Sequence, residues 1–169
     1  FGVTAAGGAG WQLAEWVVNG EPTVDMLGVD PRRFGVVSKN FAKIKNEEAY
    51  AHVFVNHFPM EERAEARPAK TTPVYDRLDK AGAVWGARFG WERPNWFAPK
   101  NVKRGDNYSF RRSNWFEHVG NEVRATRENV GLIELSSFSK FEIEGKFARE
   151  YIDKLVANNI PQNAGGLSL

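Results

Sequence analysis

A glycine-rich segment near the start of the chain has residue types suited to binding a ligand through its backbone. We expect a strand ending near residue 5, a tight turn, and a helix from Trp11 to Asn19. Small residues let a ligand approach the main chain, and free N–H groups at a helix start attract negative charge. A ligand-free strand-to-helix turn explains the local pattern equally well. The candidate binding residues are Ala6, Gly7, Gly8, Ala9 and Gly10.

A second candidate combines arginines with aromatic residues in segment 110–116, which includes Arg111, Arg112 and Trp115. Arginine beside aromatic rings can stack on an anionic ligand or on a nucleic acid. The formal charge is only +2, so nucleic-acid binding is the minor interpretation. The simpler interpretation is an amphipathic strand or loop with paired arginines. We expect no nucleic-acid partner.

Other chemistry is not indicated by the sequence. The chain has no Cys, which excludes disulfides and thiolate sites. His52 and His57 are five residues apart, which does not place them on one helical face, and His118 is remote in sequence. No nucleophile triad or acid–base carboxylate pair is apparent. We therefore predict no catalytic residue and no metal ligand in this chain.

The composition is that of a globular protein, with 42% apolar and 13% aromatic residues. No apolar run approaches the roughly 20 residues that a membrane-spanning helix needs. Trp85, Trp91, Trp96 and Trp115 lie close together in sequence and indicate a packed aromatic layer or a pocket wall. The chain does not begin with Met, and we expect it to be an internal piece of a longer polypeptide.

The elements expected to position these residues follow from periodicity and from helix stops. The expected helices are Trp11–Asn19 ending at Gly20, Ser38–Asn56, Val74–Lys80 after the Thr72-Pro73 cap, Asn121–Asn129 and Phe147–Ala157. The expected strands are Ala83–Trp91, Leu132–Leu135, Lys140–Glu144 and a last one from Leu167, with a loop over Pro94–Asp106. Segment 59–72, charged and bracketed by prolines, is the best candidate for a domain boundary.

Several of these stretches, in this order, resemble one family of enzymes. The motifs are Gly7–Gly10, Leu13–Trp16, Gly20–Pro22, Asp30–Phe34, Glu61–Arg63, Thr72–Leu78, Gly90–Phe97, Phe110–Phe116 and Val130–Ser136. They are similar to motifs of dimethylglycine and sarcosine dehydrogenases, in which a flavin domain is fused to a domain resembling the glycine-cleavage T-protein. The resemblance covers nearly the whole chain.

The resemblance implies a mixed fold, α+β with an α/β part, divided into three. Residues 1–33 would end the FAD-dependent oxidoreductase domain, residues 34–67 would be a helical connecting segment, and residues 68–169 would begin the folate-binding domain. Such a piece would leave sheet edges unpaired and apolar faces uncovered. We therefore expect the chain to be ordered only together with the rest of its polypeptide. That remaining part of the polypeptide is one of its expected partners.

The resemblance also implies a function. The flavin half would oxidise an N-methyl amine to an iminium, and the folate half would capture the one-carbon unit with tetrahydrofolate. The Ala6–Gly10 backbone would lie beside the FAD ring. Phe138 stands where T-proteins carry a Met that packs on the folate pterin. The electron acceptor would be oxygen or an electron-transfer flavoprotein, and the compartment would be the cytoplasm or the mitochondrial matrix.

Two other functions stay open. One is a non-catalytic regulatory subunit of the same family, and the other is a folate-dependent aminomethyltransferase or demethylase without redox chemistry. The glycine-rich segment favours the oxidoreductase, since a pure transferase would not need it. We expect the 169-residue chain alone to have no amine dehydrogenase activity.

Overall fold

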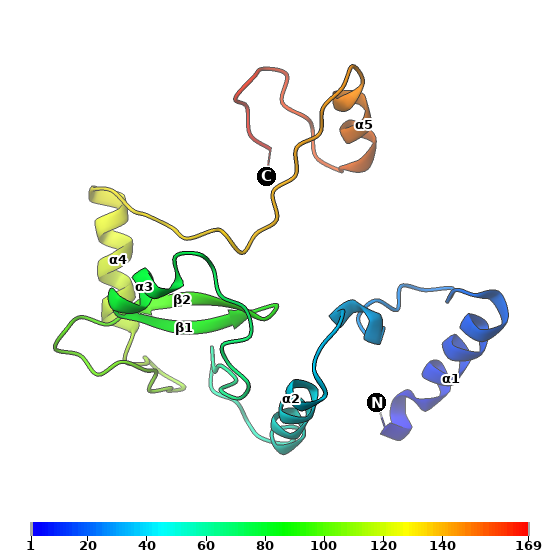
Figure 1. Ribbon diagram of the computed structural model, residues 1–169, viewed down its shortest axis with the longest axis horizontal. Coiled ribbons are helices and arrows are strands. Elements are labelled where there is room, and N and C mark those ends of the chain that lie inside the picture. Colours follow the sequence, from blue (N-terminus) through cyan, green and yellow to red (C-terminus); the bar gives the residue numbers. More distant parts are fainter. Residues whose placement is uncertain (1, 169) are drawn as a thin grey trace. The chain divides into compact units, whose positions relative to one another are not determined.

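The computed structural model describes residues 2–168, which divide into two compact units (Figure 1). The first unit is the chain up to His57 together with Arg63–Arg67, and the second is Phe58–Glu62 together with the chain from Pro68 onward. The first contains α1 (Gly2–Asn19), a 3-10 turn (Pro31–Phe34) and α2 (Lys39–Ala51). The second contains α3 (Tyr75–Lys80), β1 (Ala83–Arg88), β2 (Trp91–Phe97), α4 (Phe116–Glu128) and α5 (Ala148–Leu155).

Helix α1 begins much earlier than the sequence predicts. The strand and tight turn expected before Trp11 are wrong, because the chain is helical from Gly2 onward. A strand needs a neighbour to accept and donate its backbone hydrogen bonds, whereas a helix satisfies them internally. Alanines favour the helix and no proline interrupts it. The predicted end is confirmed: Gly20 has φ +82° and its N–H donates to the carbonyl of Trp16.

Helix α2 has the start predicted from Ser38, whose hydroxyl accepts a hydrogen bond from the N–H of Phe41. It ends at Ala51 rather than near Asn56. Its Glu48 is buried, and the carboxylate accepts a hydrogen bond from the N–H of Glu65 and pairs with Lys45. Burial opposes ionisation of Glu48, but these hydrogen bonds prevail and lower its pKa.

An antiparallel β1–β2 hairpin organises the second unit, with a bulge between Val84 and Trp85. Strand β2 continues through Pro94, where a loop was predicted. The N–H of Glu92, two residues earlier, points away from β1 and donates to the carbonyl of Lys70. Backbone N–H groups alternate in direction along a strand, so position 94, like position 92, faces away from β1. A proline at position 94 therefore removes no hydrogen bond between the strands.

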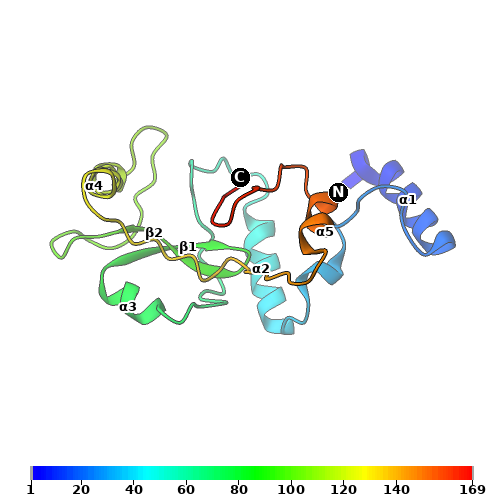
Figure 2. The ribbon, with the colours of Figure 1, turned by 90° about the horizontal axis from the view of Figure 1, so that it is seen from above.

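The core of this unit is small. Val84, Trp96 and Ala98 are buried, and residues of the following loop and of α4 pack against them. Helix α3 packs on β1 and α4 packs on β2 (Figure 2). Helices α3, α4 and α5 are confirmed as elements, although α4 begins earlier, at Phe116. The Thr72-Pro73 cap of α3 is wrong, because this helix begins at Tyr75 and its N-cap, Val74, makes no side-chain capping hydrogen bond.

The strands predicted over Leu132–Leu135 and Lys140–Glu144 are wrong, because both segments are irregular. Leu132 and Phe141 are almost fully exposed, so no neighbouring strand or apolar face covers their side chains. Residues 167 and 168 are not in a strand either, and Leu169 lies outside the described residues. The mixture of helices with one small sheet is consistent with the α+β class.

Candidate functional site

The predicted flavin-facing residues Ala6, Gly7, Gly8, Ala9 and Gly10 lie inside α1. The free amides of a helix belong to its first turn, whereas amides at these positions bond within the helix. The conformation therefore offers no backbone cradle for an anion at residues 6–10. A Cβ added at Gly7, Gly8 or Gly10 would meet nothing within 4 Å, so packing in this unit does not require these glycines. Their contact with FAD stays a prediction.

The predicted folate residue, Phe138, is presented on a fixed turn of the second unit. Its N–H donates to the carbonyl of Leu135 at 3.1 Å. The Lys140 ammonium donates to the carbonyls of Leu135 and Phe138, at 2.6 and 2.8 Å. Phe138 as a residue is 53% exposed. The ring is therefore held by its backbone and is still accessible to a ligand.

Arg93 of β2 reaches the same ring. Its guanidinium carbon lies 4.8 Å from the centroid of Phe138, in the geometry of a cation–π contact. An aromatic ring beside a guanidinium can stack on a flat heterocycle and attract a carboxylate. The residues present thus fit a pterin that carries an acidic tail. Arg93 falls within the Gly90–Phe97 motif of the resemblance, but no sequence pattern pointed to Arg93 or Lys140 as part of this site.

A cavity of about 170 Å³ lies elsewhere in this unit, lined by Met60, Asn95, Trp96, Asp106, Trp115 and Val119. The Trp96 indole N–H donates to Asp106 at 2.8 Å, and the Tyr108 hydroxyl donates to the same carboxylate at 3.2 Å. The Tyr108 oxygen accepts the N–H of Glu62 at 3.0 Å. Burial raises the pKa of Tyr108, and the Asp106 carboxylate also opposes its ionisation. This network fixes one wall of the cavity.

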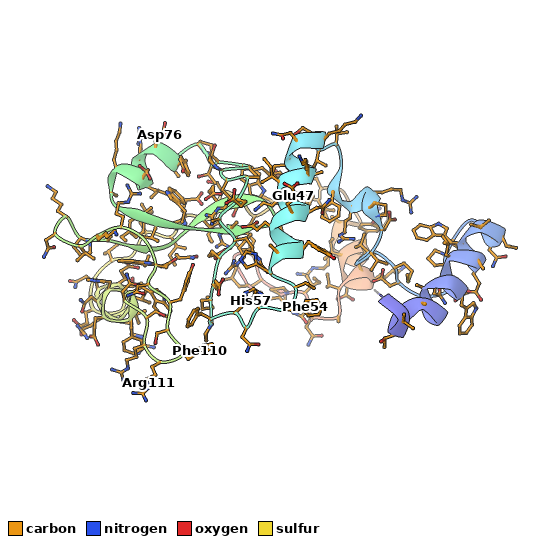
Figure 3. The ribbon with its side chains drawn as sticks, turned by 90° about the horizontal axis from the view of Figure 1, so that it is seen from below. Glu47, Phe54, His57, Asp76, Phe110 and Arg111 are labelled. Carbon is orange, nitrogen blue, oxygen red and sulfur yellow. The ribbon has the colours of Figure 1, made fainter. Side chains whose placement is uncertain are left out.

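The arginine–aromatic segment has internal partners. Phe110 packs against Phe58 with the ring centroids 4.6 Å apart, and Arg111 comes from the same loop (Figure 3). The Arg112 guanidinium lies 4.3 Å from the ring of Phe116 and 4.0 Å from the Glu117 carboxylate. For Arg112, the interpretation as a paired arginine is confirmed.

The histidines also have structural contacts. His118 stacks on Trp96 with centroids 5.3 Å apart, and the His52 and His57 rings lie 5.8 Å apart. Within residues 2–168, no group of three or more His, Asp or Glu side chains could hold a metal ion. No helix in the same range is both long and apolar enough to cross a membrane.

Comparison with known proteins identifies two consecutive segments. Residues 19–72 match the FAD dependent oxidoreductase central domain, and residues 74–169 match the GCVT N-terminal domain. The first match ends and the second begins within the stretch that separates Arg67 from α3.

Individual relatives match both segments together. Mouse (Mus musculus) mitochondrial dimethylglycine dehydrogenase is 36% identical over 96% of the chain and 19% of its own length. The 4-methylaminobutanoate oxidase (formaldehyde-forming) of Paenarthrobacter nicotinovorans is 37% identical over 88% of the chain and 18% of its own length. The mouse mitochondrial pyruvate dehydrogenase phosphatase regulatory subunit is 35% identical over 97% of the chain and 21% of its own length.

The chain thus spans about a fifth of the length of these relatives. The order of the two matched segments and the identity across nearly all of the chain lead to one conclusion. The chain belongs to the dimethylglycine and sarcosine dehydrogenase family, with an FAD dependent oxidoreductase central domain followed by a GCVT N-terminal domain.

Proposed function

We propose that the natural polypeptide containing this chain oxidises a small N-methylated amine with FAD and passes the one-carbon unit to tetrahydrofolate. The observation that carries the proposal is the succession, in one chain, of an oxidoreductase central domain at 19–72 and a GCVT N-terminal domain at 74–169. Two relatives whose names state a redox activity on methylated amines, the dimethylglycine dehydrogenase and the 4-methylaminobutanoate oxidase, support it.

Within this proposal, the residues of the chain bind and orient the folate and the FAD. Phe138 would stack on the pterin, and Arg93 would attract a carboxylate of the same ligand. Ala6–Gly10 would contact FAD, whose role is to accept the electrons of the amine. The chain provides no group proposed to transfer a proton. The domain limits at residues 33 and 67 belong to this proposal too.

The partners follow from the same chemistry. The substrate is a small methylated amine, and the electron acceptor is oxygen or an electron-transfer flavoprotein. Two relatives carry the word mitochondrial in their names, which favours the mitochondrial matrix over the cytoplasm for this protein.

The first test is an anaerobic titration of the natural polypeptide with methylated amines, followed by visible absorption. The panel is dimethylglycine, sarcosine and 4-methylaminobutanoate, with glycine as the unmethylated control. We expect an oxidised flavin spectrum that bleaches with at least one methylated amine and not with glycine. A flavin spectrum that no amine bleaches would contradict the proposed oxidation.

A regulatory subunit is the second candidate, supported by the 35% identity to the phosphatase regulatory subunit. It predicts no bleaching by any amine and co-purification with a phosphatase. A folate-dependent transferase without redox chemistry predicts tetrahydrofolate binding in a polypeptide that has no flavin spectrum.

A further inference from the structure

Segment 58–62 belongs to the second unit, although the residues on both sides of it belong to the first. Its backbone makes a local turn: the N–H of Glu61 donates to the carbonyl of Phe58, and Met60 has φ +62°. Non-glycine residues seldom adopt a positive φ unless surrounding contacts impose it. The segment is therefore held in place rather than passing freely between the units.

The Glu62 carboxylate makes the strongest contacts of the segment. It accepts hydrogen bonds from the N–H of Ala87 at 3.2 Å, from the Asn95 side-chain amide at 3.2 Å and from the Arg88 guanidinium at 3.1 Å. The side chain of Glu62 is 12% exposed. A nearly buried carboxylate with a cationic partner and two neutral donors is well satisfied.

The hairpin is shaped for this carboxylate. A Cβ added at Gly86 would lie 2.4 Å from the Glu62 Oε1 atom and 2.5 Å from the Asn95 amide. A glycine at this position therefore leaves the space that Glu62 and Asn95 fill. Ala87 lies on the outer edge of β1, where its N–H would otherwise lack a strand partner.

Further contacts hold the segment along its length. The N–H of Glu62 donates to the Tyr108 hydroxyl, and Phe58 packs on Tyr108 and Phe110. Met60 forms one wall of the cavity that also contacts Trp96 and Trp115. Release of the segment would therefore open that cavity as well as the edge of β1.

We propose that residues 58–62 form a strap, and that Ala87, Arg88 and Asn95 around Gly86 form a carboxylate-binding cradle whose occupant is Glu62. The strap closes the free edge of β1. It fixes residues 58–62, which lie within the segment 19–72 that matches the oxidoreductase central domain, on the hairpin of the second unit. This holds whether or not the proposed enzymatic function is correct.

The test is limited trypsin digestion of the natural polypeptide, followed as the rate of cleavage after Arg63 by mass spectrometry. We expect Glu62→Ala and Asn95→Ala to speed this cleavage about tenfold or more, because cleavage follows the population in which the strap is open. Asn95→Ala leaves the sequence around the cleaved bond unchanged. Gly86→Ala should have the same effect by displacing Glu62.

Two matched controls separate the strap from local charge or loop effects. Glu65→Ala lies near the same bond, and the Glu65 hydrogen bond to Glu48 uses the backbone N–H. Asn101→Ala changes an exposed asparagine of the loop after β2. Both should cleave at the wild-type rate.

Equal cleavage rates for Glu62→Ala, Asn95→Ala and the two controls would overturn the proposal. If the variants do not fold, hydrogen exchange of the Ala87 amide in the wild-type protein tests whether the strap covers the edge of β1. Protection of the Ala87 amide comparable to that of amides paired between the strands supports the strap, and exchange at the rate of an open edge refutes it.

Discussion

At the residue scale, Asp79 links three parts of the second unit through one carboxylate. It accepts the Trp85 indole N–H at 3.0 Å and pairs with Arg104 at 2.5 Å. Arg104 also donates to the carbonyl of Ala83 on the edge of β1. The hydrogen bond from Arg104, followed by that from Trp85, holds the pKa of Asp79 below its ordinary value. Asp79 therefore stabilises the fold more when it is ionised than when it is protonated.

A pH-dependent stability difference follows for Asp79→Asn. A carboxyl with a depressed pKa contributes stability above its unfolded pKa and loses it as the pH falls through the folded pKa. We expect the variant to have a lower Tm than the wild type at pH 7, and the difference should shrink as the pH falls below 3.8. Asp76→Asn, on the exposed side of α3 (Figure 3), is the control and should show little difference at either pH. A pH-independent difference for Asp79→Asn would contradict this assignment.

Phe138 is the residue on which the proposed folate site depends. Loss of a stacking ring is worth about 0.5–1.5 kcal/mol, so Phe138→Ala should weaken tetrahydrofolate binding roughly two- to twelvefold. Phe138→Met should retain more affinity, because a thioether can also contact a ring. Calorimetry of the natural polypeptide measures both. Phe141→Ala, an exposed ring in the same stretch, is the control. Equal affinities for all four proteins would remove Phe138 from the site.

At the scale of elements, two glycines play different roles. The backbone conformation requires glycine at position 82, whereas Gly120 only lowers the helix propensity of α4. Gly82 has φ +99°, and an added Cβ would lie 2.4 Å from the carbonyl oxygen of Ala98. Gly120 lies in α4 with nothing within 4 Å of an added Cβ. We expect Gly82→Ala to lower the free energy of unfolding by about 2 kcal/mol or more, and Gly120→Ala to raise it by about 0.5–1 kcal/mol. Denaturant titrations measure both. A Gly82→Ala protein as stable as Gly120→Ala would refute the strained turn.

The elements that could be predicted from the sequence are those with local signals. The Ser38 cap, the Gly20 stop and the apolar face of α5 act within a few residues, so the sequence pattern predicts them. Strands depend on partners distant in sequence, which explains the missed part of β2 and the incorrect strands at 132–135 and 140–144. The helix at residues 2–10 was missed because a glycine-rich pattern suits a turn as well as a helix interior.

The candidate site was predictable only in part. The resemblance points to Phe138, but Arg93 reaches it from β2 across some forty residues of sequence. Glu62, Ala87 and Asn95 meet in the same way, through the fold of the hairpin. No local pattern encodes such contacts, because each depends on the packing of separate segments.

At the scale of the whole molecule, apolar exposure is uneven. The buried apolar residues gather on the hairpin and just after it, whereas Val130, Leu132, Phe141 and Leu167 of the last forty residues are largely exposed. To the extent that the 169-residue chain orders without the rest of its polypeptide, its hydrogen exchange should be slowest in β1, β2 and α4, and fast over residues 130–146. Uniform protection across residues 83–168 would contradict this distribution of stability.

The proposed function couples amine oxidation to folate in one polypeptide. The most direct test follows the methyl carbon of 13C-labelled dimethylglycine, or of whichever amine bleaches the flavin, by NMR during turnover. With tetrahydrofolate present, the label should appear in methylenetetrahydrofolate, and Phe138→Ala should raise the share released as formaldehyde when tetrahydrofolate is below saturation. Label released as formaldehyde regardless of tetrahydrofolate, or an amine left unconsumed, would contradict the proposed coupling.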